Sequence, residues 1–151
     1  MLEGDPVVLL VEDNPDHALL VRIAAERALA GIALRVVEDG SEAIAYLKGA
    51  TPFDDRDRHP PPDLMLLDLM LPEVSGFQVL EWIRADGRFA ALPVVVFTSS
   101  VNPHDERRAL MLGARAFHTK PADLIELADM VRRIVTRWLP GGERRSEGLE
   151  G

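Results

Sequence analysis

The chain has 151 residues, of which 47% are apolar, as expected for one ordinary folded domain. It carries 25 acidic and 17 basic residues, and the resulting net charge of −8 disfavours a surface that binds nucleic acid or an anionic membrane. The absence of cysteine excludes disulfides, thiol catalysis and cysteine-based zinc sites. The N-terminus does not resemble a signal peptide, and no apolar run approaches the length of about 18 residues that suggests a membrane span, so we expect a cytoplasmic protein.

The first half of the chain alternates strand and helix signals. Val7 to Val11 is a continuous apolar run, as a strand covered on both faces requires. Asn14 and Pro15 then begin a helix that ends at Gly31, with Asn14 as the N-cap. Ile32 to Val37 is the second predicted strand. Apolar residues of the helix recur at helical spacing at Leu19, Leu20, Ile23, Ala24 and Ala28.

Two later pairs of residues predict helix starts of the capping-box type, in which two side chains bond each other's main-chain N–H groups. Asp39 and Glu42 form the first pair, and Ser75 and Gln78 form the second. The first helix is predicted to end near Gly49. The inward residues of these two helices are Ala43, Ile44 and Leu47, then Phe77, Leu80, Trp82 and Ile83.

Three further strands and two further helices complete the predicted elements. A short helix begins at Asn102 and Pro103 and ends at Gly113, and the last helix begins near Asp123 and Glu126. The strands are Asp63 to Leu67, Pro93 to Phe97 and, more weakly, Ala116 to Thr119. The stripe of the last helix is Leu124, Leu127, Ala128, Val131, Ile134, Val135 and Trp138, followed by Pro140-Gly141-Gly142.

This alternation predicts an α/β fold with an open, doubly wound parallel sheet of five strands in the order 2-1-3-4-5. We expect one domain over residues 1–139 and a flexible tail over 140–151. Ligands of such sheets bind beyond the carboxyl ends of the strands, next to the point where the strand order reverses.

Polar residues with complementary chemistry follow the predicted strands at that edge. They are Glu12 and Asp13 after the first strand, Asp68 after the third, Thr98 after the fourth and Lys120 after the fifth. Each one alone is ordinary turn, cap or surface chemistry. Together they place three carboxylates, a hydroxyl and an ammonium at one sheet edge, a set that fits a divalent metal and a phosphoryl group.

The same residues resemble the receiver domain of two-component response regulators, over about Val7 to Leu139. That family has an acid pair after strand one, a phospho-accepting Asp after strand three, Thr or Ser after strand four and Lys-Pro after strand five. The resemblance implies a flavodoxin-like fold and a phosphoryl group that Asp68 takes from a histidine kinase. It makes the protein a phospho-accepting signalling protein rather than an enzyme acting on other substrates.

The resemblance also implies roles around Asp68. Mg²⁺ is bound by Asp13, Asp68 and the main-chain carbonyl of Met70, with Glu12 acting largely through water. Lys120 pairs with Asp68 and neutralises a phosphoryl oxygen, while Thr98 donates a hydrogen bond to another. Phe117 is the aromatic switch partner of Thr98, although the residues alone also allow an ordinary core-edge side chain. The Lys120-Pro121 peptide bond is expected to be cis.

A predicted insertion over about residues 49–62 distinguishes this chain from a minimal receiver domain, because the connection is longer than usual. By itself it is a tolerated surface loop, but a similar loop is characteristic of stand-alone regulators paired with bacterial and cyanobacterial phytochromes. The resemblance therefore implies a bacteriophytochrome-type kinase as partner. Little sequence follows Pro140, so output is expected from the receiver surface. A homodimer through the face of the fourth helix, fifth strand and fifth helix is expected, with Trp138, Leu139 and parts of Met130 to Val135 in the contact.

Two other functions remain open at this point. A pseudo-receiver would use the fold only for binding, and intact Asp68 and Lys120 argue against it. An aspartate-nucleophile phosphohydrolase commonly has a second Asp two residues after the nucleophile, where this chain has Met70. The four histidines, among them His17 near a helix start, form no metal-ligand motif and are assigned no role.

Overall fold

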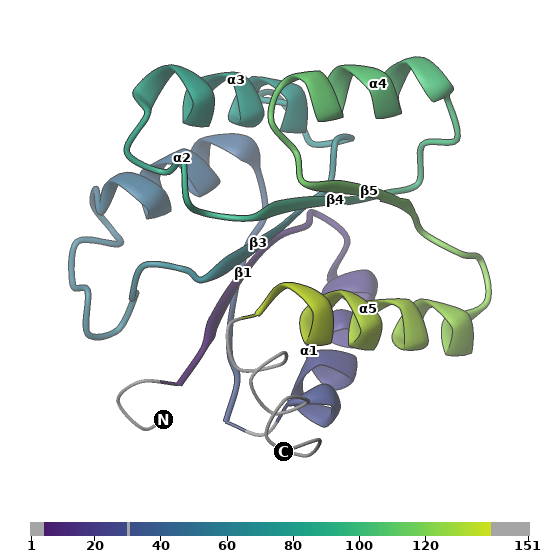
Figure 1. Ribbon diagram of the computed structural model, residues 1–151. Coiled ribbons are helices and arrows are strands. Elements are labelled where there is room, and N and C mark those ends of the chain that lie inside the picture. Colours follow the sequence, from purple (N-terminus) through teal and green to yellow (C-terminus); the bar gives the residue numbers. More distant parts are fainter. Residues whose placement is uncertain (1–4, 30, 140–151) are drawn as a thin grey trace, which may run out of the picture.

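The computed structural model describes residues 5–29 and 31–139. Five parallel strands form one sheet in the order β2-β1-β3-β4-β5, and a helix follows each strand, as predicted (Figure 1). The strands are β1 Val7–Val11, β2 Ala33–Val37, β3 Leu64–Leu67, β4 Val94–Thr98 and β5 Ala116–Thr119. The helices are α1 Pro15–Ala28, α2 Gly40–Lys48, α3 Gly76–Asp86, α4 Pro103–Met111 and α5 Leu124–Trp138.

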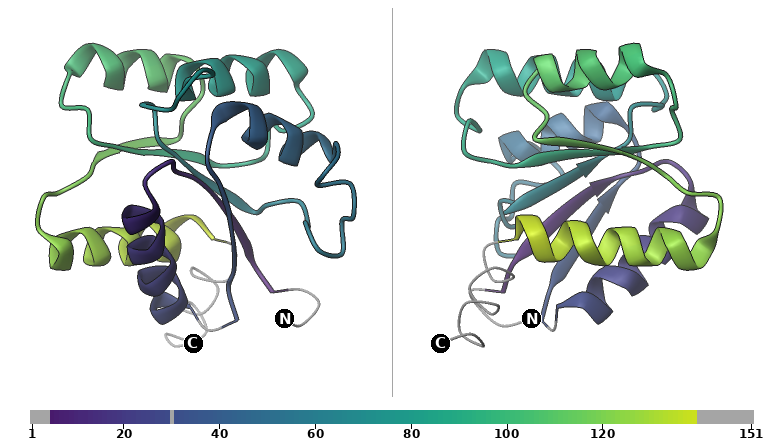
Figure 2. Two further views of the ribbon diagram at one scale, coloured as in Figure 1. Left: turned by 180° about the vertical axis from the view of Figure 1, so that it is seen from behind. Right: turned by 45° about the vertical axis from the view of Figure 1, so that its right-hand side comes forward.

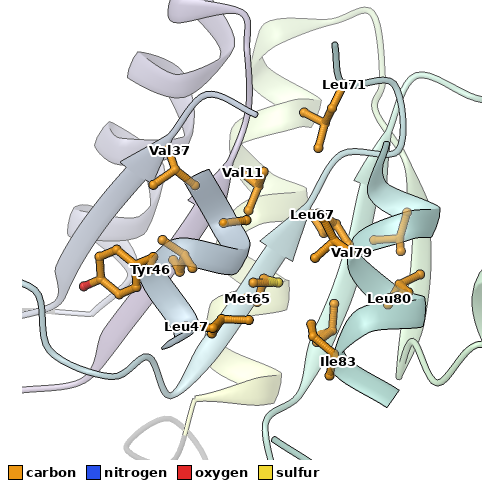
Figure 3. Packing of buried hydrophobic residues seen from close by; sticks show 14 of the residues in the cluster. Val11, Val37, Tyr46, Leu47, Met65, Leu67, Leu71, Val79, Leu80 and Ile83 are labelled. Atoms are coloured by element: carbon orange, nitrogen blue, oxygen red, sulfur yellow. The ribbon is translucent and has the colours of Figure 1, made fainter. Parts of the chain in front are cut away.

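The sheet lies between two layers of helices. Helices α2, α3 and α4 cover one face and α1 and α5 cover the other, as both views in Figure 2 show. Alternate residues of β1 therefore enter two separate cores: Leu9 and Val11 pack under α2 and α3, while Val8 and Leu10 pack under α1 and α5. This double burial explains why the strands are continuously apolar. Figure 3 shows the first core between the sheet and helices α2 and α3.

The helix starts follow the predicted capping chemistry with one difference. Ser75 and Gln78 form a complete capping box at α3. At α2, the Asp39 side chain accepts from the N–H of Glu42, as predicted. The Glu42 carboxylate, however, accepts from the N–H of Glu38 rather than that of the N-cap residue, so the predicted reciprocal box is wrong at this helix. The Glu42 carboxylate thus still satisfies a main-chain N–H group just before the helix start.

Helix α1 buries a different face from the predicted one, and α5 buries the predicted stripe except at its first residue. In α1, Leu19 and Ile23 are 57% and 41% exposed, and the small residues Ala24 and Ala25 are buried instead. Small side chains suit the close packing of α1 beside α5 on the same face of the sheet. In α5, Leu124 is 57% exposed because the first turn extends beyond the core, whereas the middle of the predicted stripe is buried.

The turn between β3 and α3 depends on a glycine. A Cβ atom placed on Gly76 would lie 2.4 Å from the carbonyl oxygen of Asp68 and 2.7 Å from the Cα of Leu69. Both atoms belong to the main chain and have little freedom to move. Gly76 thus allows α3 to begin directly against the residue that ends β3.

The predicted insertion is anchored to α2 by an arginine and a small aromatic cluster. Arg56 donates to main-chain carbonyls of α2 and of the insertion itself, and the rings of Tyr46, Phe53 and His59 contact one another. Burial raises the pKa of Tyr46, whose hydroxyl donates to the carbonyl of Pro60 at 2.8 Å. The segment is therefore a packed extension of the first core.

One cis peptide bond occurs in the described part of the chain, at Thr51-Pro52 within the insertion. The prediction of a cis bond at Lys120-Pro121 is wrong, because that bond has the trans form that X-Pro bonds prefer. Among the described residues, no helix is both long enough and apolar enough to span a bilayer. The predicted tail over 140–151 lies outside those residues.

Candidate functional site

The carboxyl ends of four strands bring the predicted polar residues together. Val11 and Leu67 are register partners, and so are Thr98 and Thr119, while Leu67 pairs with Val96, so β4 continues past the end of β3 to bring Thr98 beside Asp68. Parallel strands in register place the residues that follow them side by side. Four of the side chains are enclosed and Asp13 is exposed at the mouth; the enclosed ones belong to Glu12, Asp68, Thr98 and Lys120.

Asp68 has defined partners on both carboxylate oxygens. Its Oδ1 accepts hydrogen bonds from the Thr98 hydroxyl at 2.8 Å and from the main-chain N–H of Met70 at 3.1 Å. Its Oδ2 accepts from the Lys120 ammonium at 3.0 Å. A carboxylate that is only 6% exposed needs such partners to remain charged. The Thr98 hydroxyl therefore contacts the Asp68 carboxylate directly.

The Lys120 side chain, 4% exposed, is the buried cation of the site. Besides Asp68, its ammonium pairs with the carboxylate of Glu12. It also lies 3.2 Å from the Nδ1 of His17, which stands in the first turn of α1. No role in the site was assigned to His17 from the sequence. The only available signal was its position in the chain, shortly after the acid pair and at the same sheet edge.

Three carboxylates form a group that could hold a metal ion. Oxygen atoms of Glu12, Asp13 and Asp68 all lie within 4.8 Å of one another. Carboxylate oxygens are hard ligands, which suits Mg²⁺, Mn²⁺ or Ca²⁺ better than soft metals. The donor set therefore fits a divalent cation.

The turn after β4 is connected to β5 and to α4. The main-chain N–H of Lys120 donates to the carbonyl of Thr98 at 2.6 Å, and the Thr119 hydroxyl donates to the carbonyl of Ser100 at 2.8 Å. The Ser100 hydroxyl in turn donates to Asp105 at 2.6 Å, in the first turn of α4. Phe117 is half-buried against the core under α4. A displacement of Thr98 would thus reach α4 through directly bonded groups.

A model of the response regulator receiver domain family matches residues 8–132. The chain belongs to this family. Receiver domains are phospho-accepting signalling modules of two-component systems, and the match covers all five strands and the whole of the acidic site.

Individual relatives span nearly the whole receiver. The probable methanogenesis regulatory protein FilR2 of Methanothrix harundinacea is 37% identical over 145 residues, which cover 95% of this chain and 90% of FilR2. The phosphorylated cyanobacterial phytochrome response regulator RcpA has a similar structure, with a TM-score of 0.84 and 33% identity over 91% of this chain and 99% of RcpA. The Mn²⁺-bound form of response regulator Rcp1 has a TM-score of 0.81 and 33% identity, covering 89% of this chain and 95% of Rcp1.

Proposed function

We propose that Asp68 accepts a phosphoryl group from the phosphohistidine of a histidine kinase, and that the receiver then signals through a change of its surface. The observation that carries this proposal is the pairing of both Asp68 oxygens, one with Thr98 and the other with Lys120. In the transfer, an Asp68 oxygen forms an O–P bond while the N–P bond breaks, and the bonding pair stays on the imidazole nitrogen. Lys120 and Thr98 then contact different phosphoryl oxygens.

Mg²⁺ is the proposed cofactor, held by Glu12, Asp13, Asp68 and the main-chain carbonyl of Met70. The grouping of the three carboxylates and the Mn²⁺-bound form of Rcp1 support this assignment. A divalent ion bound there offsets the repulsion between the Asp68 carboxylate and an incoming phosphoryl anion. The Met70 side chain is 66% exposed and brings no acid to the site, which favours a phospho-acceptor over a phosphohydrolase.

Incubation with acetyl phosphate and Mg²⁺ tests the acceptor role. We expect intact-mass measurement to show one added phosphoryl group, and peptide mapping to place it on Asp68. Asp68→Asn and chelation of Mg²⁺ should each abolish the adduct, whereas Asp16→Asn, an exposed acid in the first turn of α1, should not. A wild-type chain that stays unmodified would reject the proposal and favour a receiver fold used only for binding.

The proposed switch pairs Thr98 with Phe117. Thr98 is fully buried and already turned toward Asp68, and Phe117 is half-buried on the neighbouring strand. Contacts between Thr98 and a phosphoryl group would favour one packing of Phe117 over another, which is a shift between existing populations. The bonds from Thr119 to Ser100 and from Ser100 to Asp105 connect that change to α4.

The proposed donor is a histidine kinase, with a bacteriophytochrome as the specific candidate. RcpA is described as a phytochrome response regulator, and this chain shares most of its length with that protein. FilR2 is described as a methanogenesis regulatory protein, so kinases with other inputs are the alternative donors. Phosphotransfer from phosphorylated kinase cores of both kinds decides between them.

We also propose that the protein is cytoplasmic, that residues 1–139 form one domain, and that no nucleic acid is a partner.

A homodimer through α4, β5 and α5 is the proposed output. The residues expected in the contact are mostly core: Val131, Ile134, Val135 and Leu139 are at most 2% exposed. The exposed large apolar side chains on α4 are Leu110 and Met111, and a hollow of about 200 Å³ lies beside β5. Burial, and then the nearby Arg133, lower the pKa of His118, which lines that hollow.

Sedimentation velocity with and without acetyl phosphate tests the dimer. We expect phosphorylation to raise the dimer fraction of wild type and Met111→Glu to suppress that rise, because a charge would replace an apolar side chain that is 76% exposed. Leu19→Glu, which changes an exposed apolar side chain on α1, outside the proposed face, is the control and should behave as wild type. Unchanged association in the Met111 variant would exclude this part of the face.

A further inference from the structure

The Lys120 ammonium has three N–H donors and three acceptors arranged around it. Two acceptors are carboxylates, those of Glu12 and Asp68, and the third is the Nδ1 atom of His17 at 3.2 Å. An ammonium group cannot accept a hydrogen bond. Nδ1 must therefore be the acceptor, which assigns the ring proton of His17 to Nε2.

His17 differs from the other two partners in charge and in position. Glu12 and Asp68 carry negative charge and belong to the acidic group that fits a metal, so their oxygens would take other partners when a divalent cation binds. The His17 ring lies outside that group. Its Nδ1 is 3.9 Å from the nearest Glu12 oxygen, beyond hydrogen-bond range, and its side chain is 32% exposed. Of the three acceptors, His17 alone keeps its bond to Lys120 free of competition from the metal.

We propose that His17 is a positioning residue, which holds the Lys120 ammonium toward Asp68 through its Nδ1 acceptor. This inference rests on the proposed function, because it concerns the cation that meets the phosphoryl group. His17 lies in the first turn of α1, which Asn14 caps by accepting from the N–H of His17 at 3.3 Å. The cap fixes the main chain that carries the His17 ring. Lys120, on the turn after β5, is thus oriented by an element from the other end of the chain.

Two substitutions separate the acceptor atom from the bulk of the ring. His17→Phe keeps a planar ring and removes the acceptor, whereas His17→Asn places an amide oxygen at the same number of bonds from the main chain as Nδ1. With saturating Mg²⁺, we expect His17→Phe to phosphorylate about threefold to tenfold more slowly with acetyl phosphate, the effect of one lost hydrogen bond. His17→Asn should stay within about twofold of wild type.

The Mg²⁺ dissociation constant is the second readout, and it should change little in either variant because His17 is not in the acidic group. Equal rates for His17→Phe and wild type would overturn the inference. Equal slowing of both variants would also overturn it, because the histidine would then act only through the start of α1.

The tautomer of His17 gives a measurement that does not depend on phosphorylation. In long-range ¹H–¹⁵N spectra of the wild type, we expect Nδ1 to be the unprotonated ring nitrogen, and this preference to weaken in Lys120→Ala. A proton on Nδ1 in the wild type would overturn the inference even if Asp68 is phosphorylated normally. Conversely, the expected tautomer in a wild-type chain that takes no phosphoryl group would reject the proposed function and leave the contact intact.

Discussion

Replacing Lys120 with alanine is expected to lower the free energy of unfolding of the metal-free protein by about 3–5 kcal/mol. The side chain is 4% exposed, and its ammonium faces the buried carboxylates of Glu12 and Asp68. Its removal leaves two enclosed negative charges close together, without the cation that compensates them. Urea denaturation in the presence of a chelator measures the difference.

Arg132→Ala is the matched control for this prediction. Arg132 also pairs with a carboxylate, that of Asp129, but its side chain is 60% exposed. An exposed pair of this kind contributes little to stability, because water and salt screen it. If Lys120→Ala were no more destabilising than Arg132→Ala, the buried carboxylates would not depend on Lys120.

Added Mg²⁺ should recover part of the stability lost in Lys120→Ala. The substitution leaves the three carboxylates of the acidic group in place, so the variant retains ligands for a divalent cation. An ion that binds only the folded state stabilises it by mass action, and in the variant it also supplies the missing positive charge. The gain on adding Mg²⁺ should therefore be larger in the variant than in wild type.

The arrangement of the candidate site was largely predictable from sequence because three of its four strands are continuous apolar runs that lead directly into its polar residues, whereas the strand before Lys120 is mixed. Such runs identify buried parallel strands, and the parallel arrangement brings their ends to one edge. Asp68, Thr98 and Lys120 thus meet as the order of the strands requires. The pairing of Lys120 with Asp68 was expected, but the contact of His17 with Lys120 was not predictable, because it depends on how α1 is rotated.

The buried face of a helix was harder to predict than the position of a strand, because it depends on how the helix packs against its neighbours. In α1, apolar residues occur around much of the helix, so periodicity alone does not show that Ala24 and Ala25 face the core while Leu19 and Ile23 face outward. The distinction comes from the space between α1 and α5, which small side chains fill. A sequence pattern reports which positions are apolar and does not report the distance between neighbouring helices.

The insertion is expected to depend on Arg56, and Arg56→Ala should lower the free energy of unfolding by about 2–4 kcal/mol. Its guanidinium donates to the carbonyls of Tyr46 at 2.8 Å and Leu47 at 3.1 Å, in the last turn of α2. It also donates to the carbonyl of His59 at 3.0 Å within the insertion. Loss of the side chain would free both ends of this connection together.

The geometry of the guanidinium is as important as its charge. Its planar fork reaches carbonyls from two segments at once and lies over the Tyr46 ring, with 5.6 Å from Cζ to the ring centre. A lysine carries the same charge on a single nitrogen and cannot reproduce that fork. We therefore expect Arg56→Lys to recover less than half of the stability lost in Arg56→Ala.

Arg58→Ala is the matched control within the same insertion. The Arg58 side chain is 83% exposed and forms a 3.8 Å pair with Asp55, so its removal should change stability by less than about 1 kcal/mol. Limited proteolysis offers a local readout, and cleavage within residues 49–62 should accelerate in Arg56→Ala and remain slow in Arg58→Ala. Equal stability and equal cleavage of the two variants would show that the aromatic contacts of Phe53 and His59 hold the segment without Arg56.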